Sequence, residues 1–403
     1  MAYVQSADMG FFPLDEELEL QPGKLTPKGR ERLVRLSGWM PFRQATELFA
    51  DFTGIALSKL VSQRGTEAAG KVYEEMQKAE SQELLEKKPR AIAQPKKVQI
   101  SADGAMVPLL HGVWAEVRTL VIGEVQPAVQ EKGEQVVHTH NLSYFSRKVS
   151  SQEFETLALV EMHRRGVENA KEVAAVMDGA EWEQNFTDYH CPRAVRILDF
   201  AHAAEHISPV GEFLHGEQTP ENKAWLNERL HQLKHEGPTK LLSAFQKLQR
   251  KYPTTELIRG NLAYLKKREQ QMQYPTFQAQ GWPIGSGIVE SGNKLVVEAR
   301  LKGSGMHWAE PHINPMLAIR NILCSDRWQE EWPKVEAGIR ARTKKRTVPD
   351  QPHVISGDQA LLLILNEKLN DPQPPTTKSP KSNSWRNFKY GKSLYQSTLP
   401  PKL

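Results

Sequence analysis

The sequence has little cysteine and no long apolar stretch. It contains two cysteines among 403 residues, which excludes a disulfide framework and a zinc site built from thiolates alone. The longest aliphatic run, Ala360 to Leu365, is far shorter than the roughly 20 residues that a membrane-spanning helix needs. The first residues lack a basic segment followed by an apolar one, so we expect no signal peptide. These absences predict a protein of a reducing, cytoplasmic compartment with no membrane partner.

Excess positive charge is also scarce outside the C-terminal part. The chain has 53 Lys and Arg against 48 Asp and Glu, a net charge of +5. The last 77 residues hold 14 basic and 7 acidic side chains, so the remainder is slightly acidic. A basic tail is typical of proteins that bind nucleic acid, and it is equally compatible with a tail that only aids solubility. The basic residues that could contact a DNA backbone are Arg340, Arg342, Lys344, Lys345, Arg346 and Arg386.

The pattern of apolar residues divides the chain into five regions. Residues 1–95 are predicted to be helical, and two of their short helices are compatible with a DNA-binding helix-turn-helix or with a plain helical bundle. Residues 96–200 carry strand-like and helical segments in the order β-β-β-α-β-α-β, which predicts a mixed α/β domain. The pattern further predicts a helical insertion at 201–280, the end of the α/β domain at 281–348 and a basic tail at 349–403.

Three carboxylates stand at the edges of predicted elements. Asp103 closes the first strand, Asp178 closes the fourth, and Glu290 begins the helix after a glycine-rich segment. Cleavage of a phosphodiester needs charge neutralised on the attacking and leaving oxygens, which two divalent cations held by carboxylates can supply. Both aspartates precede glycine, however, and Asp-Gly is also typical of a tight turn. An acid near a helix start is likewise favoured by the helix dipole alone.

His202, Glu205 and His206 form an H-x-x-E-H string. On a helix the two histidines share one face and could bind zinc, with the glutamate as general base, as in a zinc metallopeptidase. No distinctive third ligand follows, so the string is equally compatible with a His202 that hydrogen-bonds near the strand end at Asp199. A hydrolase with paired carboxylates is a further alternative.

Several motifs together resemble those of one known family. The segments Asp103-Gly-Ala, Asp178-Gly-Ala-Glu-Trp182, 197–207 and 285–308 resemble bacterial insertion-sequence transposases of the ISKra group, as does the N-terminal string GFFPLDEELELQPGKLTPKGRERLVRL. The resemblance covers nearly the whole chain. It implies the DDE class: an RNase H-like core with a mixed five-stranded sheet and a helical insertion, preceded by a helical N-terminal domain. It also implies a bacterial, nucleoid-associated protein.

The resemblance assigns roles to particular residues. Asp103, Asp178 and Glu290 match the three catalytic acids, which would hold two Mg²⁺ or Mn²⁺ ions. Asp199 and His202 match an auxiliary D-x-x-H string, although Asp199 also ends a strand and is an alternative to the preferred Asp178 as second acid. Further DNA contacts are expected on and after the Glu290 helix, at Lys294, Arg300 and Lys302.

The activity that the resemblance implies is DNA transposition. The enzyme would cleave phosphodiester bonds at the ends of an insertion sequence and join the freed 3′-hydroxyl to target DNA. Residues 1–95 would recognise the terminal inverted repeats, and the need to hold two ends implies a homo-oligomer. A transposase descendant that binds DNA without chemistry remains an alternative, and the presence of all three acids favours an active enzyme.

Overall fold

The computed structural model describes residues 25–131 and 134–347. The described residues up to Lys345 belong to one compact unit, which ends before Arg346. The expected basic tail, 349–403, lies outside the described residues, and so does Arg386. Within the described ranges, no helix combines the length and the apolar character that crossing a membrane requires.

In the described part of the chain, three helices precede the sheet: α2 (Pro27–Trp39), α3 (Phe42–Thr53) and α4 (Lys59–Lys87). The side chain of Thr26 caps α2 by accepting a hydrogen bond from Gly29 N at 3.1 Å. An apolar cluster that contains Val34, Tyr73 and Ile319 joins α2 and α4 to two later helices, α14 (Ile313–Cys324) and α15 (Trp328–Thr347). The N-terminal helices therefore share a core with the end of the compact unit.

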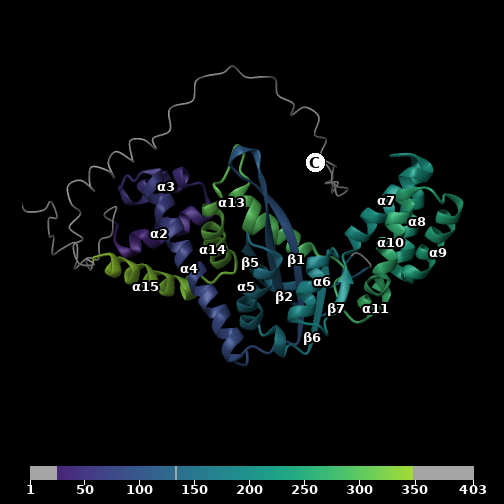
Figure 1. Cartoon of the computed structure of the whole chain (residues 1–403), viewed down its shortest axis with the longest axis horizontal. Helices are drawn as coiled ribbons and strands as arrows, with labels where there is room; N and C mark the ends of the chain where they lie inside the picture. Colours follow the sequence, from purple (N-terminus) through teal and green to yellow (C-terminus); the bar gives the residue numbers. More distant parts are fainter. Residues whose placement is uncertain (1–24, 132–133, 348–403) are drawn as a thin grey trace, which may run out of the picture. The chain divides into compact units, whose positions relative to one another are not determined.

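A mixed five-stranded sheet lies between these helices and the insertion (Figure 1). Its strands stand in the order β5-β2-β1-β6-β7. Strand β2 is antiparallel to β1 and β5, whereas β6 is parallel to β1 and β7 to β6. The predicted α/β class is confirmed. The strands are β1 (Lys97–Pro108), β2 (Trp114–Val125), β5 (Thr139–Arg147), β6 (Glu172–Met177) and β7 (Val195–Leu198), and a small hairpin pairs β3 (Val129–Glu131) with β4 (Glu134–Val136).

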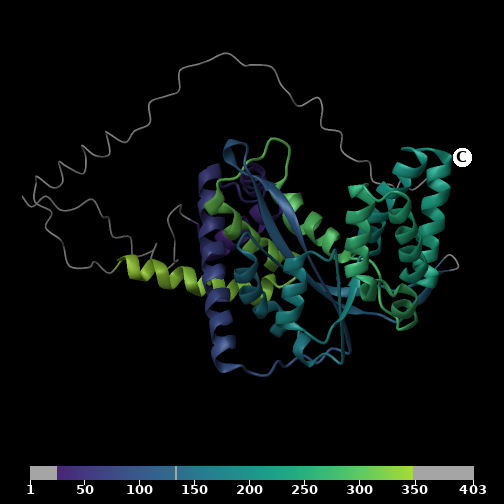
Figure 2. The same cartoon turned by 45° about the vertical axis from the view of Figure 1, so that its right-hand side comes forward.

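Strands β1 and β2 form a hairpin that extends past the rest of the sheet (Figure 2). Their pairing continues to Pro108, whereas β6 pairs with β1 only as far as Ile100. Asp103 therefore lies inside the hairpin, opposite Thr119, and the expected strand end at this position is wrong. The strand continues because apolar residues such as Val107 keep returning to the buried face after the glycine.

Helices cover both faces of the sheet. On one face, α5 (Ser151–Arg164) and α6 (Glu181–His190) pack Phe154 and Phe186 against Leu120. On the other face, Val121 contacts a cluster formed by α14 and by the three-part helix that carries Glu290. That helix consists of α12 (Gly287–Gly292), the π-helical segment η4 (Asn293–Glu298) and α13 (Ala299–Leu301). Short 3₁₀ turns are η1 (Leu110–Gly112), η2 (Val167–Asn169) and η5 (Glu310–His312).

The helical insertion separates β7 from α12. Its core, which contains Leu241 and Phe245, is continuous with Ile197 on β7, and Figure 1 shows its helices beyond that edge of the sheet. The insertion leaves and rejoins the sheet at adjacent points, where Phe200 N donates to Ile284 O at 3.0 Å. Its elements are α7 (Phe200–His215), α8 (Pro220–Glu236), α9 (Pro238–Lys251), α10 (Glu256–Lys267), η3 (Glu269–Met272) and α11 (Tyr274–Ala279).

Candidate functional site

Three carboxylates from neighbouring elements converge beside the sheet. Asp103 on β1, Asp178 directly after β6 and Glu183 on α6 each offer one oxygen, and these oxygens all lie within 4.8 Å of one another. The neighbouring positions of β1 and β6 bring the two aspartates together. Among the residues that the structure describes, this acid cluster is the only such group of three Asp, Glu, His or Cys side chains. A ligand set made only of oxygen suits Mg²⁺ or Mn²⁺.

The turn after β6 fixes the position of Asp178. Its Oδ1 accepts a hydrogen bond from Ala180 N at 2.7 Å, and Gly179 N donates to Glu183 Oε2 at 3.1 Å. Gly179 has a φ of +86°, in the left-handed region that glycine adopts without strain. The Asp-Gly turn expected from the sequence is therefore present here, and it holds a member of the acid cluster.

Asp103 is held from both sides. Its Oδ1 accepts from Gly104 N at 2.6 Å and its Oδ2 from Asn293 Nδ2 at 2.9 Å. Burial raises the pKa of Asp103 to about 6, and the charges of Asp178 and Glu290 raise it further. The two hydrogen bonds partly offset this because they lower the pKa. Asn293 lies three residues after Glu290, so this amide ties the Glu290 helix to the acid on β1.

Sequence reasoning missed Glu183, although its environment is the most unusual of the three. The side chain is fully buried, and its Oε1 meets no hydrogen-bond donor in the described part of the chain. Burial, together with Asp178 and the charge of Asp103, raises the pKa of Glu183 to about 11. Without a cation it therefore carries a proton at neutral pH and can donate it to Asp178. In the sequence it resembles an ordinary acid in the first turn of a helix.

Glu290 lies outside this acid cluster. Its side chain is 57% exposed, and its Oε2 lies 3.8 Å from Lys294 Nζ. Its charge nevertheless contributes to the raised pKa of Asp103, so it acts on the cluster from its rim. Of the expected trio, the structure brings Asp103 and Asp178 together, and Glu183 is the third member of the cluster in place of Glu290.

Asp199 is buried, and its carboxylate binds backbone amides outside the acid cluster. Its Oδ1 accepts from His202 N at 2.7 Å and caps α7, and its Oδ2 accepts from Ser286 N at 2.5 Å. Both oxygens are thus used by backbone amides, and Asp199 is not a member of the cluster. This geometry favours Asp178 as the second acid, and it makes Asp199 the tie between α7 and the loop before Glu290.

The histidines of the H-x-x-E-H string have their own partners. His202 Nδ1 lies 3.2 Å from Glu205 Oε2. The His206 ring stacks on Tyr264 with centroids 3.6 Å apart, and its Nδ1 donates to Asn261 Oδ1 at 2.8 Å. Within the described residues, His202, Glu205 and His206 do not bring ligand atoms together for one ion. The structure therefore gives the alternative zinc site no support.

The basic residues expected near Glu290 differ in their exposure. Lys294 is 71% exposed, and Lys302 pairs with Glu298 at 2.7 Å. Arg300 is 2% exposed, and its Nε donates to Ser37 O at 2.9 Å, at the end of α2. A DNA phosphate cannot reach a guanidinium buried in this way, so the expected DNA contact at Arg300 is wrong.

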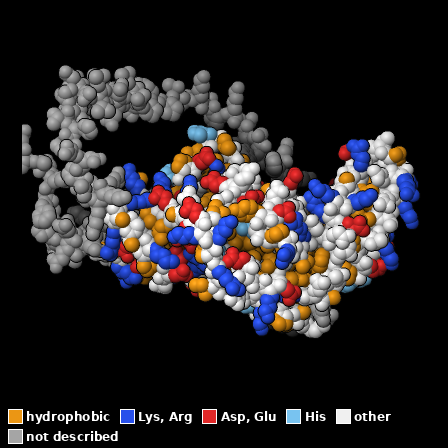
Figure 3. All heavy atoms as spheres, turned by 60° about the horizontal axis from the view of Figure 1, so that its bottom comes forward, with side chains coloured by type: hydrophobic (Ala, Val, Ile, Leu, Met, Phe, Trp, Pro, Cys, Tyr) orange, Lys and Arg blue, Asp and Glu red, His pale blue; other side chains and the backbone are white. Residues whose placement is uncertain are grey.

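The expected basic run lies on α15. Arg340 lies 3.7 Å from Glu336, and Arg342 pairs with Glu75 on α4. The side chains of the next basic residues, Lys344, Lys345 and Arg346, fall outside the described residues. On the face drawn in Figure 3, basic and acidic side chains are interspersed over the described part.

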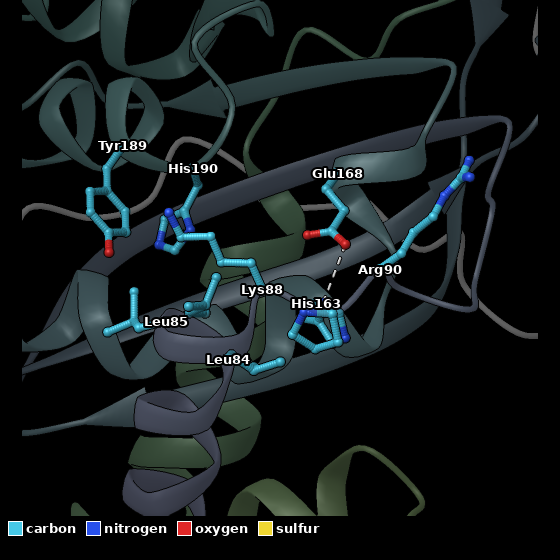
Figure 4. Close-up of a pocket in the computed structure, with 10 residues that line it drawn as sticks. Leu84, Leu85, Lys88, Arg90, His163, Glu168, Tyr189 and His190 are labelled. Carbon is cyan, nitrogen blue, oxygen red and sulfur yellow. Dashed lines mark ion pairs between the residues drawn. The ribbon is translucent and has the colours of Figure 1, made fainter.

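A surface cavity of about 510 Å³ lies where α4, α5 and α6 meet (Figure 4). His163 and Glu168 face each other there, with Nδ1 and Oε1 3.3 Å apart. Burial lowers the pKa of His190 to about 4, so this ring is neutral at physiological pH. The lining contains none of the expected site residues and no member of the acid cluster.

No protein-family model matches the chain, and no curated protein matches it. The acid cluster and the fold that carries it are therefore the basis for a proposed function.

Proposed function

We propose that this chain is a DDE-type DNA transposase with an RNase H-like core. One observation carries the proposal: Asp103 on β1 and Asp178 after the neighbouring β6 converge, while the Glu290 helix packs over the antiparallel part of the same sheet. The sheet order, with β5, β2 and β1 antiparallel and β6 and β7 parallel to β1, supports the RNase H-like assignment.

The acid cluster fits a divalent cation. All its ligand atoms are oxygens, and two buried oxygens at the site, Glu183 Oε1 and Asn293 Oδ1, accept no hydrogen bond from the described residues. Asp103, Asp178 and Glu183 would hold a first ion, and Glu290 would complete a second site from the rim. Bound Mg²⁺ or Mn²⁺ would neutralise charge on the phosphodiester oxygens.

The protein residues supply position and rigidity. Asn293 orients Asp103, and Asp199 holds the loop from which the Glu290 helix starts. The exposed ammonium of Lys294, one turn after Glu290, would pair with a DNA phosphate. On this proposal the substrates are double-stranded DNA at terminal inverted repeats and at the target, and the enzyme acts as a homo-oligomer.

A plasmid-cleavage assay tests the proposal. The substrate is a supercoiled plasmid that carries the genomic DNA flanking this coding sequence, incubated with Mg²⁺, with Mn²⁺ or with EDTA. We expect metal-dependent cleavage that falls at least about 100-fold in Asp103→Asn and Asp178→Asn, because each removes negative charge at the cation site. The matched control is Asp188→Asn, an exposed acid of α6 that pairs with Arg196, and it should cleave as the wild type does.

Other outcomes separate the alternatives. Specific binding of this DNA without cleavage would indicate a transposase-derived protein that has lost its chemistry. Cleavage that persists in Asp178→Asn and disappears in Asp199→Asn would contradict the choice of second acid. Stoichiometric zinc that is lost in His202→Ala would revive the metallopeptidase.

A further inference from the structure

The helical insertion contacts the Asp178 turn through two side chains at the C-terminal end of α10. Tyr264 Oη donates to Asp178 O at 2.5 Å. Arg268 donates to Gly179 O from Nη2 at 2.5 Å and from Nε at 3.2 Å. The insertion therefore holds two consecutive peptide carbonyls, one of which belongs to a member of the acid cluster.

The packing at Gly179 shows how closely the two elements approach. A Cβ atom built on Gly179 would lie 2.5 Å from Arg268 Nε and 3.0 Å from Tyr264 Oη. These separations are shorter than ordinary carbon contacts, so a side chain at position 179 would push Arg268 and Tyr264 away from the turn. Glycine is thus favoured at this position both by its positive φ and by the close approach of these two side chains.

The two donors are held in place by a stack of rings. The Arg268 guanidinium and the His206 imidazole each lie 3.6 Å from the centroid of the Tyr264 ring. Two groups at that distance cannot share one face, so they cover opposite faces of the phenol. His206 comes from α7 and is fixed by Asn261 of α10. The stack therefore restricts the rotation of Tyr264 and keeps its hydroxyl on the Asp178 carbonyl.

We propose that Tyr264 and Arg268 are positioning residues through which the insertion sets the cation affinity of the acid cluster. The inference rests on the proposed function, because it takes the cluster to be the cation site. The carbonyl and the side chain of Asp178 branch from the same Cα atom, so a fixed peptide plane restricts where the carboxylate points. Partners that orient metal ligands in this way typically change metal affinity about 10–100-fold when removed.

The test measures Mn²⁺ affinity of the full chain by isothermal titration calorimetry, with electron paramagnetic resonance as a second readout. We expect about 10-fold weaker binding in Tyr264→Phe and a larger loss in Arg268→Ala, with an intermediate loss in Arg268→Lys, which keeps the charge but not the paired donors. Asp178→Asn identifies the site by abolishing the signal.

The matched control is Tyr274→Phe. Tyr274 is a buried phenol of the same insertion, and its Oη donates to Leu198 O at 3.0 Å, at the end of β7. Tyr274→Phe removes one hydrogen bond to a backbone carbonyl, as Tyr264→Phe does, and should lower stability by a similar amount. It should nevertheless leave Mn²⁺ affinity within about twofold of the wild type. A loss in Tyr274→Phe as large as in Tyr264→Phe would show a general effect of destabilisation and overturn the inference.

Hydrogen exchange provides a readout that needs no bound metal. The amides of Gly179 and Ala180 donate within the turn, so we expect them to exchange faster in Tyr264→Phe and Arg268→Ala than in the wild type and in Tyr274→Phe. Unchanged exchange at these amides would overturn the inference, and so would unchanged Mn²⁺ affinity or a wild type that binds no Mn²⁺ at Asp178. Weakened Mn²⁺ binding in a protein that cleaves no DNA would support the inference while contradicting the proposed function.

Discussion

At the scale of single residues, Glu183 dominates the pH dependence of the site. Its pKa in the folded chain is about 11, against an ordinary value of 4.5. Between these values the folded state keeps a proton that the unfolded state releases. The free energy of unfolding therefore falls as pH rises from 4.5 towards 11, so at neutral pH the buried acid already costs stability when no cation is bound.

Glu183→Gln tests this assignment. At pH 8 the unfolded chain ionises Glu183, whereas the folded chain must keep it protonated, and this difference lowers the free energy of unfolding. A neutral amide of the same shape removes the difference, so we expect the melting temperature in EDTA at pH 8 to rise by about 3 °C. The gain should shrink towards pH 4, where both proteins are neutral at this position. Mn²⁺ affinity should fall about 10-fold or more, because one ligand is lost.

The control for this prediction is Glu181→Gln, an exposed acid of the same helical turn. Thermal scans at several pH values, with titration calorimetry for Mn²⁺, provide both measurements. A Glu183→Gln protein that binds Mn²⁺ as tightly as the wild type would show that Glu183 orients Asp178 and is not itself a ligand.

Asp103 and Asp178 could be predicted from the sequence because each stands at the edge of a strand-like run and within a motif that resembles the transposase family. Glu183 could not be found in the same way. An acid in the first turn of a helix is common, and only the burial of that turn beneath Phe154 and beside the cluster makes it unusual. The DNA contact predicted for Arg300 is wrong because the side chain is buried against α2, which is distant in the sequence.

At the scale of elements, we expect Asp199 to contribute to stability and not to cation binding. In Asp199→Ala, helix α7 loses its cap and Ser286 N loses its acceptor, so we expect a fall of about 2–5 °C in melting temperature. Mn²⁺ affinity at the acid cluster should stay within about twofold of the wild type, because Asp199 is not a member of the cluster. Asp178→Ala should show the opposite pattern. Thermal scans and titration calorimetry on both variants check the prediction, and loss of Mn²⁺ binding in Asp199→Ala would contradict it.

Local signals predict some of the helix boundaries. Thr26 before Pro27 marks the start of α2, and Gly54 ends α3 in the left-handed region. The π-helical segment after Glu290 carries no such signal. Arg320 on α14 supports it by donating to Leu295 O and Val296 O, a tertiary contact that no window of local sequence contains.

At the scale of the whole molecule, the insertion and the sheet share one apolar core. Replacing residues 201–280 with a short Gly-Ser linker would uncover Val176 and Leu198, which are buried by the insertion core. We expect the shortened protein to lose cooperative unfolding and to bind a hydrophobic dye. Calorimetry and dye fluorescence measure this, and the control is an exposed substitution in the intact chain, Glu228→Gln. A soluble remainder with a sharp melting transition would contradict the prediction.

The two ends of the insertion meet in hydrogen bonds, from Phe200 to Ile284 and from Ser286 to Asp199. The two ends of a segment of more than 80 residues therefore lie as close together as the ends of a short loop. The entropy of closing a loop grows only with the logarithm of its length, so the segment could lengthen or be exchanged without displacing Glu290. This junction is a natural grafting point: any module that presents an apolar face to β6 and β7 could be inserted there, which would place a different surface beside the same acid cluster.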